Sequence, residues 1–237
     1  MSENIPVVIL CGGRGTRLAE QTDMMPKPMV RIGGRPILWH IMKHYAHYGY
    51  DEFILALGYK GDQIRQYFAE LKSESWNVHL IDTGTDTLTG GRLKYLEPLI
   101  GDKMFMMTYG DGMAPIDIPK LLAFHQAHHG LVTLAAVRPP ARFGALEFDG
   151  DRISHFKEKS TLHEGWINGG FFVIEPASLQ YIVGDVMWEH APMERLAETG
   201  QLYAYKHEGF WQCMDTLRDL RYLEATWVKG NAPWKTW

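Results

Sequence analysis

Short apolar runs alternate with amphipathic segments through the first 137 residues, and this alternation restricts the possible fold more than any other feature. The apolar runs carry almost no charge, which is typical of strands buried on both faces of a parallel sheet. The segments between them repeat apolar residues three and four positions apart, as helices do. The predicted strands are Val7–Leu10, Phe53–Leu57, Val78–Ile81, Met104–Met107 and Leu131–Val137. This order predicts an α/β fold with a mostly parallel sheet, right-handed crossovers and helices on both faces.

The second half of the chain is richer in short strand candidates and poorer in helices. This pattern predicts a small β-rich extension packed on the same, mixed central sheet. No low-complexity linker, charge block or internal repeat separates the halves, so residues 1–237 are expected to form a single domain. Helices are predicted over Ile37–Tyr45, Ile64–Leu71, Leu93–Leu96, Ile116–His128 and Thr216–Lys229, and the later strands over Ala145–Phe148, Arg152–Phe156, Phe171–Ile174 and Leu202–Tyr205.

Composition argues against several functional classes. The 24 Lys and Arg residues are outnumbered by 28 Asp and Glu, and the net charge of −4 argues against a nucleic-acid-binding protein that depends on excess positive charge. The apolar run Ile5–Cys11 is too short to span a membrane, and no cationic segment of a secretory signal precedes it. A cytoplasmic location without membrane contact is therefore expected. Cys11 and Cys213 show no zinc-ligand spacing, so reduced thiols are expected.

Several histidines and tryptophans are expected to be structural. His40, His44 and His47 lie at helical spacing, but no carboxylate joins them locally, so no metal site is predicted there. Trp211 and the other tryptophans near the carboxyl end are expected mainly in core packing or subunit contacts, and the alternative role is stacking on a base or sugar. These residues therefore do not point to a function.

A glycine-rich segment, Leu10–Leu18, directly follows the first predicted strand. Its three glycines allow the backbone to approach a ligand closely and to present N–H groups, which suits a polyphosphate at the carboxyl end of a strand. The spacing matches neither the dinucleotide-binding glycine pattern nor the P-loop pattern, which argues against a nicotinamide-dependent oxidoreductase. The alternative interpretation is a tight glycine turn without a ligand.

Two basic residues near the glycine-rich segment are candidates for contacting phosphate. Lys27 stands between Pro26 and Pro28, whose restricted backbone can hold the ammonium in a fixed direction. Together with Arg17, it can neutralise negative charge that develops on phosphate oxygens. The alternative for Lys27 alone is an ordinary solvated loop residue.

Two aspartates are candidates for holding a metal ion. Asp111 follows a buried strand and stands between Gly110 and Gly112, so its carboxylate is expected at the carboxyl edge of the sheet, where open α/β folds bind ligands. Asp215 directly precedes the last predicted helix, where the alternative role is a helix N-cap. If the two carboxylates converge, they can bind Mg²⁺ together with substrate phosphates and water.

Several motifs resemble those of the sugar-1-phosphate nucleotidyltransferases, and the likeness extends from end to end of the chain. The glycine-rich segment combined with Lys27 is similar to the signature of that superfamily. Narrower matches resemble the branch that uses CTP and α-D-glucose 1-phosphate. These matches are Asp82–Gly84, Thr89–Lys94, Arg142–Leu146, Ile167–Val173, Phe210–Asp219 and Ala232–Trp237. The resemblance implies the Rossmann-like nucleotidyltransferase fold.

The resemblance further implies that residues 1–130 mainly bind the nucleotide. Arg17, Lys27 and Asp111 would be the catalytic residues, and Asp111 and Asp215 would bind Mg²⁺. The implied nucleotide contacts are Leu10, Cys11, Gly12, Gly13, Arg14, Gly15, Thr16, Gly110 and, near the cytosine and its ribose, Thr83 and Thr89.

An acceptor site is implied by the same resemblance in residues 131–237. Glu158 and Lys159 match the family's Glu-Lys pair, which contacts sugar hydroxyls and the sugar phosphate. Asn168 and Gly169 match residues that line the acceptor pocket.

The chain departs from the family pattern in two places. The family carries an inserted stretch before the segment that begins at Asp82, whereas here Leu71 runs almost directly into the third predicted strand. The missing insertion bears on subunit contacts or on coverage of the acceptor, so the identity of the acceptor stays open. Ser160 stands where the family has a proline, which is expected to have little effect.

The implied activity is a Mg²⁺-dependent transfer of CMP, in which a phosphate oxygen of α-D-glucose 1-phosphate attacks the α-phosphorus of CTP and pyrophosphate leaves. The nucleophile is already anionic near neutral pH, so no general base is needed. Three alternatives stay open: another phosphorylated acceptor, UTP or dTTP in place of CTP, and a non-catalytic sugar-nucleotide sensor. Relatives usually assemble, so a homo-oligomer is expected.

Overall fold

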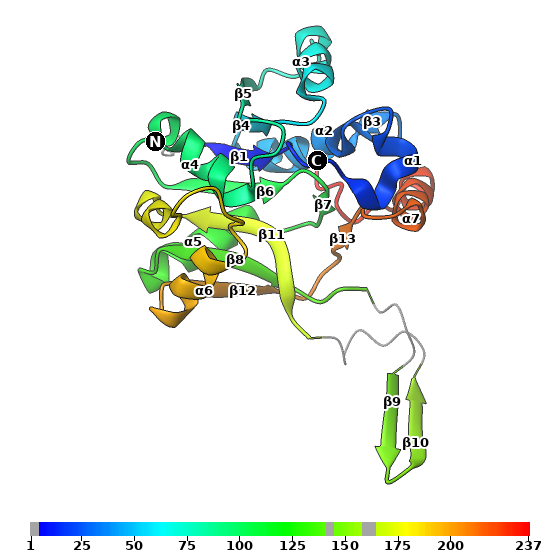
Figure 1. Cartoon of the computed structure of the whole chain (residues 1–237). Helices are drawn as coiled ribbons and strands as arrows, with labels where there is room; N and C mark the ends of the chain where they lie inside the picture. The colour runs from blue at the N-terminus through cyan, green and yellow to red at the C-terminus, as the bar shows by residue number, and fades with distance from the viewer. Residues whose placement is uncertain (1–4, 141–144, 158–164) are drawn as a thin grey trace.

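The computed structural model describes residues 5–140, 145–157 and 165–237, and a seven-stranded sheet forms its centre (Figure 1). In spatial order the strands are β12 (Leu202–His207), β8 (Val132–Val137), β11 (Ile167–Ile174), β6 (Phe105–Tyr109), β1 (Val7–Leu10), β4 (Glu52–Leu57) and β5 (Asn77–Asp82). β1 is parallel to β4 and β6, β4 to β5, and β8 to β12. Only β11 is antiparallel to its neighbours in this sheet. The sheet is therefore mixed and mostly parallel, as predicted.

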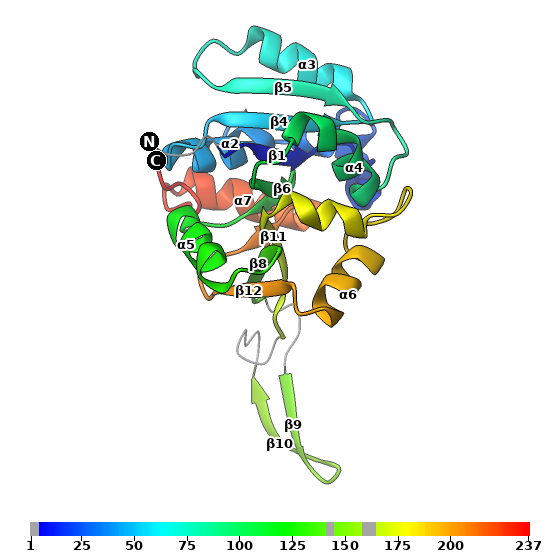
Figure 2. The same ribbon diagram turned by 90° about the vertical axis from the view of Figure 1, so that its left-hand side faces the viewer.

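Helices cover both faces of the sheet because alternate residues of a strand point to opposite sides. Val7 and Ile9 of β1 belong to one buried apolar cluster, and Val8 and Leu10 to the other. The helices are α1 (Ala19–Thr22), α2 (Ile37–His47), α3 (Gly61–Glu70), α4 (Thr89–Ile100), α5 (Ile118–His128), α6 (Ala191–Glu198) and α7 (Leu217–Val228). Figure 2 shows α2, α5 and α7 on one side of the sheet and α4 and α6 on the other. Within the described residues, no helix has the length and apolar character that a membrane crossing requires.

The helix predicted over Leu93–Leu96 is longer than expected, because α4 begins at Thr89 and ends at Ile100. Two glycines in its first turn, which are poor helix formers, concealed the start. Gly90 is required by close packing: a Cβ there would lie 2.6 Å from the carbonyl oxygen of Val186. Tertiary contact thus overrides local propensity at this helix.

The strands predicted between residues 145 and 156 form a hairpin of their own instead of joining the main sheet. β9 (Ala145–Asp149) pairs antiparallel with β10 (Arg152–Lys157) as a separate two-stranded sheet. Figure 1 shows this hairpin away from the seven-stranded sheet. The β-rich extension is therefore divided, since β8, β11 and β12 lie in the central sheet and the hairpin does not.

The residue that caps α7 is Thr216 and not Asp215. The Thr216 hydroxyl accepts a hydrogen bond from the Asp219 amide at 3.3 Å, and the Asp219 carboxylate accepts one from the Thr216 amide at 2.8 Å. This reciprocal pair is a capping box. The N-cap interpretation of Asp215 is therefore wrong, and its carboxylate points elsewhere.

His40 and His44 are buried on the inner side of α2. The His40 ring contacts tryptophans of the carboxyl-terminal segment, and the His44 ring contacts Tyr48 and Phe171. The His40 Nε2 atom lies 2.8 Å from the Ile32 carbonyl oxygen, and the His44 Nδ1 atom lies 3.0 Å from the Thr236 hydroxyl. Burial lowers the pKa of each imidazole to about 4. Both rings are therefore neutral at pH 7, and neither belongs to a cluster of metal-ligating residues among those described.

These two histidines make stability depend on pH. Histidines in the unfolded chain titrate near 6.5, so between about pH 6.5 and 4 the unfolded state binds more protons than the folded state. We expect the free energy of unfolding to fall as the pH is lowered through this window, by on the order of 3 kcal/mol for each histidine. Urea unfolding at a series of pH values measures this fall. His44→Gln should make the dependence shallower, whereas an unchanged slope would contradict the explanation; His47→Gln, on the exposed side of α2, is the control.

Candidate active site

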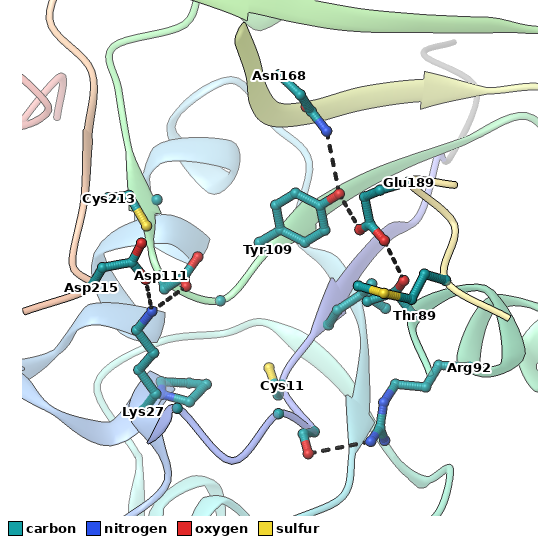
Figure 3. A pocket seen from close by; sticks show the side chains of 18 of the residues that line it. Cys11, Lys27, Thr89, Arg92, Tyr109, Asp111, Asn168, Glu189, Cys213 and Asp215 are labelled. Carbon is teal, nitrogen blue, oxygen red and sulfur yellow. Dashed lines mark hydrogen bonds and ion pairs between the residues drawn. The ribbon is translucent and has the colours of Figure 1, made fainter. Parts of the chain in front are cut away.

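A cavity of about 550 Å³ opens at the carboxyl ends of β1 and β6, which are neighbours in the sheet (Figure 3). Parallel strands end at the same edge of a sheet, so the loops that follow them meet there. The glycine-rich segment follows β1, and the segment containing Asp111 follows β6. The predicted site residues that line the cavity are Leu10, Cys11, Gly12, Gly13, Gly15, Arg17, Lys27, Thr89, Gly110, Asp111, Asn168, Gly169 and Asp215.

Some predicted site residues lie elsewhere. Arg14 and Thr16 are exposed and outside the cavity wall, and Thr83 is buried behind that wall. The predicted acceptor residues Glu158 and Lys159 lie outside the described residues, as do Ser160 and the first three residues of the motif at 142–146.

The glycine-rich segment is held against the sheet by its backbone. The Cys11 amide donates to the Ala56 carbonyl at 2.9 Å, and the Tyr59 amide donates to the Gly12 carbonyl at 3.1 Å. Burial raises the pKa of the Cys11 thiol, so this side chain acts as a small neutral residue, as expected. Gly15 has a φ of +63°, a region that other residues rarely adopt, and this turn brings the segment close to Lys27.

Arg92 of α4 holds the glycine-rich segment in place through hydrogen bonds. Its guanidinium donates to the Gly12 carbonyl at 3.2 Å, to the Leu57 carbonyl at 2.8 Å and to the Thr83 hydroxyl at 2.6 Å. Arg92 is buried and also lines the cavity. It thus joins three loops at the carboxyl edge of the sheet. No role of Arg92 could be predicted from the sequence, because these contacts join residues far apart in the chain.

The contact between Gly12 and Arg92 yields a prediction. A Cβ on Gly12 would lie 2.1 to 2.6 Å from three guanidinium atoms of Arg92, so Gly12→Ala must displace the arginine. We expect kcat/KM for the nucleotide to fall roughly 10- to 100-fold, because a displaced segment no longer positions the substrate. Steady-state kinetics measure the effect. Gly165→Ala, outside the cavity wall, is the matched control, since nothing lies within 4 Å of its added Cβ; equal kinetics in the two variants would rule out this role of Arg92.

Lys27 joins the two aspartates that the sequence analysis singled out. Its Nζ atom lies 2.5 Å from Asp111 Oδ2 and 2.6 Å from Asp215 Oδ1. Figure 3 shows Lys27 pointing toward both carboxylates. Asp215 also accepts from Arg17 Nη1 at 2.6 Å. Lys27 begins the short 3-10 helix Lys27–Met29 after Pro26 and is 9% exposed. The interpretation of Lys27 as an ordinary solvated residue is therefore wrong.

The electrostatics of this group follow from its ion pairs. Burial alone would lower the pKa of Lys27, but the negative charge of Asp111 and the hydrogen bonds to Asp111 and Asp215 together outweigh burial, so the net pKa is raised. Burial alone would raise the pKa of Asp215, yet its hydrogen bond and ion pair with Lys27 lower it. Both groups are therefore charged at neutral pH. A site of this kind presents fixed charges of both signs to a polyanionic ligand.

The two aspartates also have the donor atoms that a divalent metal requires. Ligand atoms of Asp111, Cys213 and Asp215 all lie within 4.8 Å of one another. Carboxylate oxygens are the ligands that Mg²⁺ prefers, so the pair fits such an ion. Cys213 was missed by the sequence analysis. The signal that could have found it is its position two residues before Asp215 in an extended segment, which places both side chains on one side.

On the side of the cavity opposite Lys27, uncharged hydrogen-bond donors surround the carboxylate of Glu189. Glu189 accepts hydrogen bonds from Tyr109 Oη at 2.5 Å and from Thr89 Oγ1 at 2.6 Å, and Asn168 Nδ2 lies 3.4 Å from Tyr109 Oη (Figure 3). Neither Glu189 nor Tyr109 was predicted from the sequence as a site residue. Trp211, expected in packing or subunit contacts, also lines the cavity.

Comparison with known proteins agrees with this geometry. A family model described as nucleotidyl transferase matches residues 6–222. The chain is 48% identical to glucose-1-phosphate cytidylyltransferase of Salmonella typhi, over 97% of this chain and 98% of that protein. It is 41% identical to the probable glucose-1-phosphate cytidylyltransferase of Bacillus subtilis, over 97% and 99% of the two chains. The Salmonella alignment spans 253 positions, more than the 237 residues here, so that relative contains residues without a counterpart in this chain.

Solved structures show the same fold. HddC from Yersinia pseudotuberculosis, complexed with GMP-PN, superposes with a TM-score of 0.76 at 25% identity, over 94% of this chain and 99% of that one. A UDP-glucose pyrophosphorylase complexed with UDP-glucose superposes with a TM-score of 0.75 at 15% identity, over 96% and 100%. The expected Rossmann-like nucleotidyltransferase fold is confirmed.

Proposed function

The chain belongs to the nucleotidyl transferase family, and we propose that it transfers CMP from CTP to α-D-glucose 1-phosphate, giving CDP-glucose and pyrophosphate. The observation that carries this proposal is the likeness over nearly the whole chain to a glucose-1-phosphate cytidylyltransferase. The cavity supports it, since Lys27, Asp111 and Asp215 meet there beside the glycine-rich segment.

The reaction brings two polyanions together, so the residues at the Lys27 end of the cavity must offset their repulsion. Lys27 and Arg17 supply fixed positive charge where charge develops on the phosphate oxygens. The glycine-rich segment presents backbone N–H groups to the triphosphate. An acceptor phosphate oxygen forms a bond to the α-phosphorus, while the bond from that phosphorus to the β-phosphate oxygen breaks and pyrophosphate keeps the electron pair. The nucleophile carries its own negative charge, so no residue has to remove a proton.

Enzymes of this family use a divalent metal. We propose Mg²⁺, held by Asp111 and Asp215, which would neutralise phosphate charge and align the two substrates. The donor chemistry supports this choice, because both residues offer hard oxygen ligands.

Several predictions about organisation belong to the same proposal. Residues 1–237 would act as a single domain, with nucleotide contacts mainly before residue 130 and acceptor contacts mainly after it. Asn168 and Gly169 would contact the acceptor, together with Glu158 and Lys159. A homo-oligomer in the cytoplasm is part of the proposal as well.

A pyrophosphate-release assay tests the proposed reaction. CTP, UTP, dTTP, ATP and GTP are each combined with a panel of phosphorylated acceptors, with and without Mg²⁺. The expected result is Mg²⁺-dependent release with CTP and α-D-glucose 1-phosphate. Pyrophosphate release with UTP but not with CTP would overturn the assignment of cytosine as the base. Release from CTP only in the presence of a different phosphorylated acceptor would identify that compound as the acceptor in place of glucose 1-phosphate. Binding without any turnover would favour the sensor.

A further inference from the structure

We propose that Glu189 is a specificity-determining residue, whose carboxylate accepts a hydrogen bond from a hydroxyl group on the uncharged body of the acceptor. This inference rests on the proposed function, because it concerns the acceptor of that reaction. It concerns a residue to which the sequence analysis assigned no role.

The Glu189 carboxylate is held in one orientation by two protein donors. Oε1 accepts from Tyr109 Oη at 2.5 Å, and Oε2 accepts from Thr89 Oγ1 at 2.6 Å. Each donor is itself fixed, since the Trp188 amide donates to Thr89 Oγ1 at 2.9 Å and Asn168 Nδ2 contacts Tyr109 Oη. A carboxylate has about four acceptor positions, so two contacts leave acceptor capacity for a ligand.

The charge around Glu189 defines the kind of group that it recognises. Among the ion pairs of the described residues, none includes Glu189. Of the cations that line the cavity, Lys27 and Arg17 are paired with Asp111 and Asp215, and Arg92 donates to backbone carbonyls and to Thr83. The proposed acceptor carries an anionic phosphate and neutral hydroxyl groups. A carboxylate without a cationic partner repels the phosphate and accepts hydrogen bonds from the hydroxyl groups.

Glu189 lies between residues predicted for the two substrates, because it contacts Thr89, a predicted nucleotide contact, and reaches the acceptor side through Tyr109. Figure 3 shows Glu189 across the cavity from Lys27, where the reacting phosphates are proposed to lie. The chain of contacts from Glu189 through Tyr109 reaches Asn168, which is predicted to line the acceptor pocket. An acceptor with its phosphate near Lys27 therefore extends its ring toward Glu189.

The test crosses one variant with a set of modified acceptors. Wild type and Glu189→Gln are assayed with CTP and with glucose 1-phosphate or its 2-, 3-, 4- and 6-deoxy analogues. We expect wild type to lose roughly 10- to 100-fold in kcat/KM with at least one analogue, which is the usual effect of a lost hydrogen bond to a charged group. In Glu189→Gln the loss with that same analogue should shrink to within about threefold, because the partner of the hydroxyl is already weakened.

Controls separate this role from a structural one. Glutamine retains the size of the side chain, and thermal melting checks that the variant folds. Glu194→Gln, on α6 and outside the cavity wall, should keep the wild-type losses. The inference would be overturned if the deoxy analogues lowered kcat/KM equally in Glu189→Gln and in wild type. It would also be overturned if Glu189→Gln raised the KM for CTP and left the effect of the deoxy analogues unchanged. If wild type does not use CTP and glucose 1-phosphate at all, the proposed function fails first and the inference falls with it.

Discussion

Replacing Lys27 by methionine is expected to lower kcat by roughly 100- to 1,000-fold, the usual effect of removing one preorganised group that stabilises transition-state charge. The ammonium lies 2.5 Å from Asp111 and 2.6 Å from Asp215, and no other lysine lines the cavity wall within the described residues. Methionine has a similar length and no charge, so the variant removes the cation with little change in volume. Pyrophosphate release at saturating CTP, glucose 1-phosphate and Mg²⁺ measures the loss.

The same variant must stay folded for this result to concern catalysis. Arg17 still pairs with Asp215, and both aspartates have access to solvent, so their charges are not left in a dry interior. A thermal melt checks this point. Lys43→Met is the matched control, since Lys43 forms a partly buried ion pair with Glu74 at 2.8 Å and does not line the cavity. Turnover of Lys27→Met within a few fold of the Lys43→Met value would remove Lys27 from the proposed mechanism.

Much of the fold could be predicted because the central strands are buried on both faces. Val7–Leu10 and Phe53–Leu57 are continuous apolar runs, and such runs have few alternative structures in an α/β fold. The direction of β11 could not be predicted, since the apolar pattern of a strand is the same for parallel and antiparallel pairing. The first residue of α4 could not be predicted for a different reason. Gly90 disfavours a helix locally, and the close contact with Val186 that requires a glycine there forms only in the folded chain.

The residues of the site also differ in whether they could be predicted from the sequence. Lys27 and Asp111 could be singled out because each is marked locally, one by flanking prolines and the other by flanking glycines after a buried strand. Arg92, Cys213 and Glu189 lack such marks. Their contacts join residues far apart in the sequence: Arg92 with Gly12, and Glu189 with Thr89 and Tyr109. The local sequence pattern therefore predicts site residues that have distinctive neighbours in the sequence. It does not predict residues whose role depends on contacts with distant parts of the chain.

Replacing Asp111 by asparagine is expected to lower kcat at least about 100-fold, because the variant loses one of the two carboxylates proposed to bind the metal. Asparagine keeps the shape of the side chain and an oxygen that can accept from Lys27, so the change is confined to charge. The affinity for the metal should fall as well. Mn²⁺ binding in the presence of CTP, followed by electron paramagnetic resonance, should weaken by roughly tenfold or more.

Asp215→Asn should differ from Asp111→Asn in one respect, which tests whether the two carboxylates act as a pair. Asp215 also holds Arg17 at 2.6 Å, so its variant loses metal affinity and in addition frees the guanidinium. We expect a rise in the KM for CTP with Asp215→Asn that Asp111→Asn lacks. Asp117→Asn is the control, because Asp117 caps α5 and asparagine caps a helix equally well. Wild-type metal affinity in both site variants would show that the metal binds elsewhere, and the proposed roles of the two carboxylates would then have to be abandoned.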